Sequence, residues 1–494
     1  MKLMKHLHPS LLDKTVLLLF YGIISFALSI VAYTYLLGFD AYYYALQAKE
    51  WFFTGEVLIP DTSVIHRLVG LLQFLGLTAT TAFKVWTIIS YALFCFTYYL
   101  TIRSANRSCV VALTLFAVLS PSLIFICIEF PKTFLFMTVF NCLYYILNQN
   151  KHPLWLIPIA VVAMLSHKMG LIFTAIFAVG YMLQNKHILY HKKKYITWGC
   201  IAGIMVIVLM LPHIMVQFSR VSLASLTPGL LSILQHPNFP VSIKIECVAY
   251  IVLAIVMLVT MKPKITDLVL PIALFSMAWV PALGDEAFNI GARFAILMPY
   301  TMLLSYSMLL TKYPVKLRKQ WLMMAIVVGL IIIPFRFRWA YPTTYDINYQ
   351  SYDHLITQIT ERVTPEMLIV HKNFHLYYKF QTGHDCFSFE PEKHWDKTRI
   401  WRLVIDVSRS QFYYYLATDH DWTDLSLYSL GNQVTLIRED VYQQFKQKIN
   451  PENDPELYDT LNDHNKNPSK QRPAFLLAKY NEKDKGPFSA IYKK

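Results

Sequence analysis

The sequence predicts an α-helical polytopic membrane protein with a small α/β domain at its C-terminal end. Of its 494 residues, 55% are hydrophobic and only 15% are charged, whereas soluble proteins carry about 25% charged residues. Apolar stretches long enough to cross a hydrocarbon core of about 30 Å recur up to residue 337 and are missing after it. The membrane part is therefore expected at residues 1–337.

This part is expected to contain about eleven transmembrane helices. The first apolar stretch is too long for the core of a signal peptide, and no small-residue cleavage site follows it, so we expect a retained helix. The eleven stretches lie near 15–37, 82–102, 109–128, 131–148, 153–166, 169–184, 195–212, 245–261, 267–283, 294–311 and 321–337.

The charge pattern predicts the orientation. Residues 1–337 contain 25 Lys and Arg against 10 Asp and Glu, and residues 338–494 contain 20 against 21. Basic loops alternate with acidic ones, and the basic side is cytoplasmic by the positive-inside rule. The opposite loops carry Asp40, Glu50, Glu56, Asp61, Glu129, Asp285 and Glu286, with Glu246 at the rim of a span. Eleven spans place the N-terminus inside and the C-terminal domain outside. This distribution argues against nucleic-acid binding.

The α/β domain is expected at residues 338–450. A helix-like run at 352–363 precedes strand-like runs at 367–371, 402–407 and 433–438. The following segment, 451–494, is polar and is predicted to be partly disordered. Cys386 is the one cysteine after residue 337, so we expect neither a disulfide framework nor a structural zinc site there.

Asp40 is the first candidate for a catalytic residue. It follows the first apolar stretch in the run GFDAYYY, and a charge at that boundary is costly unless it is solvated or paired. There, a carboxylate can act as the general base for an acceptor while the lipid part of a substrate stays in the bilayer. The alternative is that Asp40 only caps a helix over 41–53.

Glu129 is the second candidate, in the outer turn EFPK after the third apolar stretch. Two functions are open for Asp40 and Glu129 as a pair. Either the two carboxylates divide the acid and base steps of a reaction, or they bind one divalent metal such as Mg²⁺ or Mn²⁺ together. The alternative is a rim ion pair between Glu129 and Lys132, which contributes little to stability.

Basic side chains on the outer side are candidates for binding a phosphate. Arg293 opens an apolar stretch, so its guanidinium and the helix N-terminus both favour an anion. Lys132, His167 and Lys168 have only their position in support, and a histidine at a helix end more often bonds a carbonyl. The remaining candidates, for the acceptor side, are Tyr43, Tyr44, Asp285 and Glu286; the tyrosines alternatively belong to the interfacial aromatic belt.

Together these residues resemble the GT-C superfamily of integral-membrane glycosyltransferases, which includes mannosyltransferases and aminoarabinose-type transferases. The similarity lies in GFDAYYYALQAKEWFFTGE at 38–56, and in the arrangement of residues 10–340. It implies that Asp40 is the catalytic acid of the family, Glu129 its second acid and Arg293 its outer-loop arginine. Some members have a paired Asp-Glu where this chain has Asp40 alone.

The resemblance implies an inverting transfer from a polyprenyl-phosphate sugar donor to a glycan, lipid or protein acceptor on the extracytoplasmic face. No nucleotide-sugar motif such as GxGxxG is present. Missing outer-side glycosylation sequons favour a bacterial inner membrane. The alternatives are a lipid-linked polysaccharide polymerase or ligase, suggested by AMLSHKMG at 163–170, and a transporter or flippase. Transporters more often show repeated halves with charges at mid-membrane.

Overall fold

A computed structural model describes two units of the chain, which are treated separately below. The membrane unit comprises residues 1–41 and 60–346, and the C-terminal unit comprises residues 42–59 and 347–494. The described residues are 9–38, 40–57, 64–103, 105, 107–148, 156–184, 197, 201, 204, 205, 208, 229–235, 240–280, 294–313, 315, 318–340, 349–363, 367–370, 372–387, 395–407, 409–416, 427–431 and 434–462.

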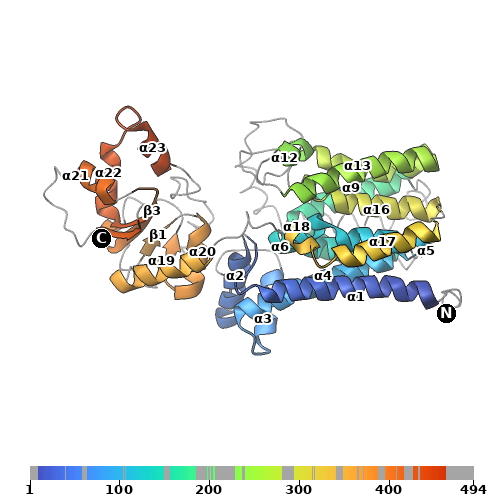
Figure 1. Cartoon of the computed structure of the whole chain (residues 1–494), viewed down its shortest axis with the longest axis horizontal. Coiled ribbons are helices and arrows are strands. Elements are labelled where there is room, and N and C mark those ends of the chain that lie inside the picture. Colours follow the sequence, from blue (N-terminus) through green and yellow to red (C-terminus); the bar gives the residue numbers. More distant parts are fainter. Residues whose placement is uncertain are drawn as a thin grey trace. The chain divides into compact units, whose positions relative to one another are not determined.

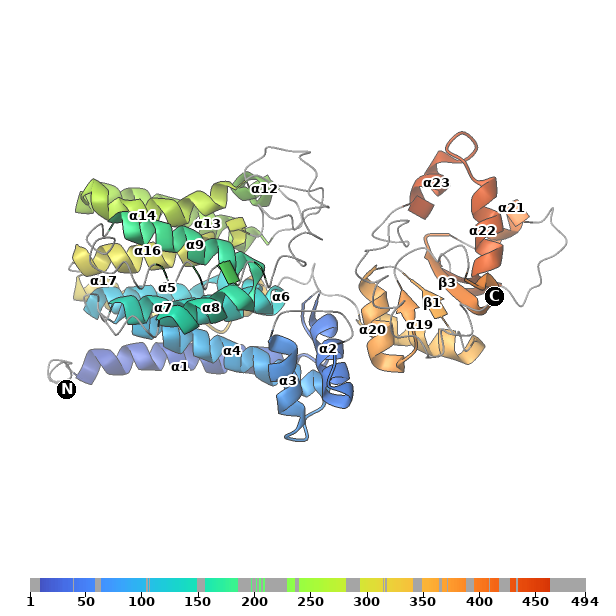
Figure 2. The same ribbon diagram turned by 180° about the vertical axis from the view of Figure 1, so that it is seen from behind.

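The membrane unit is a bundle of apolar helices that run side by side (Figures 1 and 2). Its first half contains α1 (Pro9–Ala32), α3 (Ile65–Gln73), α4 (Ala79–Ile102), α5 (Arg107–Leu119), α6 (Pro121–Glu129), α7 (Pro131–Asn148), α8 (Leu156–Ser166) and α9 (Lys168–Gln184). Its second half contains α12 (Gly229–Gln235), α13 (Val241–Met261), α14 (Ile265–Ser276), the 3₁₀ helix η3 (Met277–Trp279), α16 (Met298–Lys312), α17 (Lys319–Ile332) and α18 (Arg336–Ala340).

The helices of this unit confirm an integral membrane protein, whereas the count of eleven spans stays a prediction. Among the described residues, three helices are long and apolar enough to cross a membrane: Lys14–Ala32, Ala79–Ile102 and Val241–Met261. Ser108–Leu119 and Pro121–Glu129 form a fourth span if they are counted together, and they are bent by 49° at the break. The third apolar stretch of the sequence is therefore a broken helix, which its composition alone did not predict.

Aromatic side chains form the centre of the bundle. Phe26 stacks on Tyr91 with ring centroids 4.3 Å apart, and Phe94 lies 4.9 Å from Phe134. Tyr300 on α16 is fully buried, and its hydroxyl donates to Asn141 Oδ1 on α7 (2.9 Å). These contacts tie α1, α4, α7 and α16 together. Rings of this size supply the close packing that holds helices together in lipid, where no hydrophobic effect drives association.

The C-terminal unit is an α/β domain around a five-stranded sheet, in the order β2-β1-β3-β5-β4. β1 is parallel to β2 and β3, whereas β5 is antiparallel to β3 and β4. The strands are β1 (Met367–Ile369), β2 (Cys386–Phe387), β3 (Ile400–Ile405), β4 (Leu427–Gly431) and β5 (Val434–Arg438). The three strand-like runs of the sequence are thus confirmed as β1, β3 and β5.

Helices complete this unit around the sheet. They are α19 (Tyr349–Arg362), α20 (Lys372–Thr382), η5 (Lys397–Arg399), α21 (Arg409–Leu416), α22 (Glu439–Lys448) and α23 (Pro455–Asn462). Val404 and Ile437 of the sheet share an apolar cluster with Phe412, Tyr442 and Phe445 of α21 and α22. α23 falls within the segment predicted to be partly disordered, and the residues after 462 lie outside the described part. Burial raises the pKa of the Cys386 thiol on β2.

The helix α2 (Ala41–Thr54) belongs to this unit although it follows the first membrane helix in sequence. Tyr42 is buried, and its ring meets those of Tyr349, Tyr377 and Phe380 edge-on at 4.9, 4.7 and 5.2 Å. The Lys49 ammonium donates to the Phe380 carbonyl (3.4 Å). The predicted helix is confirmed. α19 and α20 supply a protein interior for the Tyr42 ring.

Candidate functional site

Asp40 lies in the turn that connects the segment after α1 to α2. The backbone turns at Gly38, whose φ of +103° lies in the left-handed region, and the Ala41 N–H donates to the Gly38 carbonyl (3.3 Å). A Cβ on Gly38 would lie 2.9 Å from the carbonyl oxygen of Ile128 on α6, so a larger residue does not fit. Asp40 itself is exposed and precedes the first residue of α2, which is the usual position of a helix N-cap.

Glu129 is the last residue of α6 and is only 4% exposed. Phe130 ends the helix, and α7 begins at the next residue. Because Gly38 contacts the carbonyl of Ile128, the backbone before Asp40 lies against the residue before Glu129. The turn that carries Asp40 and the end of α6 that carries Glu129 therefore meet in the membrane unit. One carboxylate is exposed there and the other is buried.

Two of the predicted cations lie at the same end of α7. Lys132 is half-buried in the first turn of α7, and His167 is half-buried between α8 and α9. The His167 carbonyl accepts from the Gly170 N–H (2.7 Å). A Cβ on Gly170 would lie 2.7 Å from Cδ2 of Phe136, one turn after Lys132. The turn between α8 and α9 thus packs on the beginning of α7, near Glu129 in sequence.

The other predicted site residues are placed as follows. Lys168 is the first residue of α9. Tyr43 and Tyr44 lie on α2 in the C-terminal unit, with ring centroids 5.2 Å apart; Tyr44 is buried and Tyr43 half-buried. Arg293, Asp285 and Glu286 lie outside the described residues. The roles of all these residues remain predictions.

Lys84 is a cation of this region that the sequence analysis missed. It lies on α4, and its ammonium donates to the backbone carbonyls of Tyr33 and Thr34 (3.1 Å for Thr34), just after the end of α1. Last-turn carbonyls of a helix have no partner within the helix, and a cation there also complements the helix dipole. A single lysine inside an apolar stretch was the signal that could have identified it.

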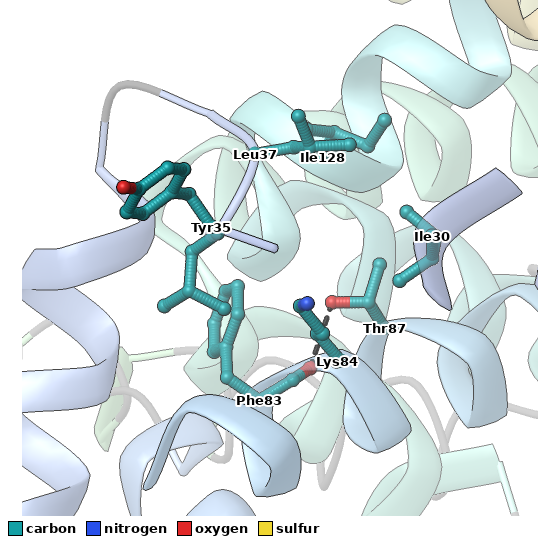
Figure 3. A pocket seen from close by; sticks show the side chains of 8 residues that line it. Ile30, Tyr35, Leu37, Phe83, Lys84, Thr87 and Ile128 are labelled. Atoms are coloured by element: carbon teal, nitrogen blue, oxygen red, sulfur yellow. Dashed lines mark hydrogen bonds between the residues drawn. The ribbon is translucent and has the colours of Figure 1, made fainter. Parts of the chain in front are cut away.

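Lys84 also lines a small cavity next to the turn of Asp40 (Figure 3). Tyr35 and Leu37, Thr87 of α4 and Ile128 of α6 surround the same space. Its volume is about 10 Å³, which is close to the smallest space that holds one water molecule. The cavity is therefore a packing gap where α1, α4 and α6 meet, too small for a sugar or a lipid chain.

The two carboxylates are of the kind that hold a divalent metal. Among the described residues, however, no group of three His, Cys, Asp or Glu side chains lies close enough together to hold an ion. A metal bound by Asp40 and Glu129 would need further ligands from substrate, water or other parts of the chain, and Mg²⁺ commonly keeps such ligands. Metal use stays a prediction.

The fold is similar to that of a solved protein. The structure of ArnT from Cupriavidus metallidurans bound to undecaprenyl phosphate superimposes with a TM-score of 0.58 at 11% sequence identity, covering 86% of this chain and 97% of that one. The apo structure of the same protein gives 0.59 at 12% identity with the same coverage. No family model and no curated protein sequence matches. At this level of sequence identity, the similarities show a shared fold.

Proposed function

We propose that this protein is a membrane glycosyltransferase that moves a sugar from a polyprenyl-phosphate donor to a glycan, lipid or protein acceptor. The observation that carries the proposal is the fold, because the matching ArnT structure is described as bound to undecaprenyl phosphate. The meeting of the Asp40 turn with the end of α6 supports it further, since two acids at one point of the bundle suit acid–base chemistry.

The proposed reaction is a single in-line displacement on the extracytoplasmic face. An acceptor oxygen forms a bond to the anomeric carbon, and the bond from that carbon to the phosphate oxygen breaks. The electron pair leaves with the polyprenyl phosphate, and Asp40 takes the proton of the acceptor. One attack from the opposite side inverts the anomeric configuration. Exposure of Asp40 suits this role, because the acceptor arrives from the aqueous side.

The other charged residues have supporting roles in this proposal. Glu129 orients the acceptor or shares a metal with Asp40. Lys132, His167, Lys168 and Arg293 offset the negative charge that develops on the departing phosphate, which is the usual electrostatic contribution to such a step. Tyr43, Tyr44, Asp285 and Glu286 contact the acceptor.

The test is sugar transfer in vitro from radiolabelled polyprenyl-phosphate sugars, with EDTA and with Mg²⁺ or Mn²⁺ added. Asp40→Asn keeps the shape and much of the capping ability but removes the base, so we expect kcat to fall by about 10²–10⁴-fold. Glu50→Gln is the matched control, because it removes an acid from the same predicted outer loop and should transfer normally.

The results of this assay distinguish the proposed function and the proposed base from their alternatives. Equal transfer by wild type and Asp40→Asn would leave Asp40 as a helix cap and make Glu129 the next candidate base. Products that grow by repeat units would favour a polymerase or ligase. No transfer by the wild type from any carrier sugar would contradict the proposed function.

A further inference from the structure

The break between α5 and α6 leaves backbone groups that need partners inside the membrane unit. α5 ends at Leu119 and α6 begins at Pro121, with a bend of 49° between them. Each helix end leaves backbone N–H or C=O groups without a partner in the helix. In an apolar surrounding each unsatisfied group costs several kcal/mol. Two charged side chains from distant parts of the chain satisfy groups on either side of the break.

Arg336 of α18 satisfies the end of α5. It is 1% exposed, and its guanidinium donates to the carbonyl of Val118 and to that of Gly22 on α1 (2.6 Å). The guanidinium also lies over the Tyr91 ring, 5.4 Å from its centroid. A cation at the C-terminal end of a helix is favoured by the helix dipole. Arg336 therefore joins α1, α4 and α5 at the break.

Glu246 of α13 satisfies the beginning of α6. Its Oε2 accepts from the backbone N–H of Ser122 (2.9 Å). The next two N–H groups donate to Ser120, that of Leu123 to its hydroxyl (3.1 Å) and that of Ile124 to its carbonyl (3.4 Å). The first residue of α6 is a proline and has no N–H, so the first turn is fully bonded. A carboxylate at a helix N-terminus is again favoured by the dipole.

The opposite end of α6 carries Glu129. The helix has nine residues, or about 13 Å at 1.5 Å per residue. A tilt of about 5° at the break would therefore move Glu129 by about 1 Å. In an enzyme, a misplacement of this size can lower the rate about 10²-fold. What holds the beginning of α6 thus decides where Glu129 stands relative to the backbone at Gly38.

We propose that Arg336 and Glu246 are positioning residues that hold α6, and with it the carboxylate of Glu129, against the turn of Asp40. The catalytic meaning of this position rests on the proposed function, whereas the position itself does not. Broken helices of transporters leave their ends open for substrates and ions. Here protein side chains bind on both sides of the break, so they hold the angle between α5 and α6.

Cysteine accessibility measures the position of α6 directly. Cys127 lies on α6, two residues before Glu129, and is 2% exposed. Its thiol donates to the Thr87 carbonyl (3.8 Å). Cys109 lies at the beginning of α5, at the opposite end of that helix from the break, and is 1% exposed. Its thiol donates to the Val315 carbonyl (3.4 Å), and it is the matched control. The reporters are full-length chains that keep only one of these two cysteines, treated in native membranes with N-ethylmaleimide.

In Glu246→Ala and Arg336→Met we expect Cys127 to react at least tenfold faster and Cys109 to react at the wild-type rate. Glu246→Gln should keep protection, because its amide oxygen still accepts from Ser122. Arg336→Lys is the milder variant and should give an intermediate rate, because one ammonium replaces a fork with two donating arms. Protection of Cys127 in every variant, or equal exposure of both cysteines, would overturn the proposal.

The transfer assay then tests the catalytic consequence. Glu246→Ala should lower kcat about 10²-fold with a donor KM within about twofold of wild type, and Glu246→Gln should restore the rate. Wild-type turnover in a variant whose Cys127 is exposed would overturn the positioning role. If the wild type transfers no sugar, the proposed function fails, and the labelling still decides whether the two residues hold α6.

Discussion

The two units bury charged side chains in opposite ways. In the C-terminal unit, Arg402 and Glu439 are both fully buried and bind each other, with Nε to Oε2 at 2.7 Å and Nη2 to Oε1 at 3.0 Å. In the membrane unit, Arg336 and Glu246 bind backbone groups on either side of a broken helix.

The difference follows from which backbone N–H and C=O groups have no backbone partner in each unit. Arg402 is paired with β1 on one side and with β5 on the other, so the neighbouring backbone groups are already bonded and its side chain needs a carboxylate. The broken span offers carbonyls at the end of α5 and N–H groups at the start of α6, and these are the groups that an apolar surrounding penalises most. A buried charge in the membrane unit thus supports backbone geometry, whereas the buried pair in the other unit joins two side chains.

The largest effect is expected from breaking the buried pair of the C-terminal unit. Arg402→Met leaves the buried Glu439 carboxylate with the Gln443 amide but without a cationic partner, and should destabilise the unit by about 3–5 kcal/mol. Adding Glu439→Leu removes the orphaned charge and should recover most of this loss. Pulse proteolysis of the purified full-length protein across a urea series measures both variants. A double variant as unstable as the single one would show that the pair matters for packing, not for charge.

An intermediate effect is expected where the backbone itself makes the contact. Gly38→Ala adds a Cβ 2.9 Å from the Ile128 carbonyl at a residue with positive φ, so the turn of Asp40 must shift. We expect transfer to fall by about 10²-fold, with expression and thermal stability in detergent measured alongside. Gly76→Ala has a similar φ of +83° with no atom within 4 Å, and serves as the control. Equal transfer by both variants would show that sugar transfer does not depend on the contact between Gly38 and the Ile128 carbonyl.

The smallest effect is expected from an exposed pair of the membrane unit. The Lys312 ammonium lies 2.7 Å from Asp267 Oδ1, but its side chain is 49% exposed. Lys312→Met should therefore change the free energy of unfolding by less than about 1 kcal/mol. Tyr313→Phe should cost more, because the Tyr313 hydroxyl bonds both Asp267 (2.7 Å) and the backbone N–H of Lys264 (3.0 Å). Thermal unfolding in detergent compares them, and the reverse order would contradict the ranking.

The elements that the sequence predicted well are those with a strong local pattern. Long apolar stretches predict α1, α4 and α13, and short runs rich in aliphatic and β-branched residues predict β3 and β5. Asp40 and Glu129 were chosen as candidates because a charge beside an apolar stretch is recognisable from the sequence alone, and their roles stay predictions. The break at Ser120 was missed because proline is common at the first position of a helix and an apolar stretch continues across it.

Composition and periodicity thus sufficed to identify a membrane protein with an α/β domain and two acids at span ends, because hydration and local hydrogen bonding act between near neighbours. Only the tertiary structure showed that Gly38 rests on Ile128, that α2 packs on α19 and α20, and that Arg336 and Glu246 bind on either side of the break. These contacts join residues that are far apart along the chain. No local pattern encodes such pairs, because their energy depends on which buried backbone groups the rest of the fold leaves unsatisfied.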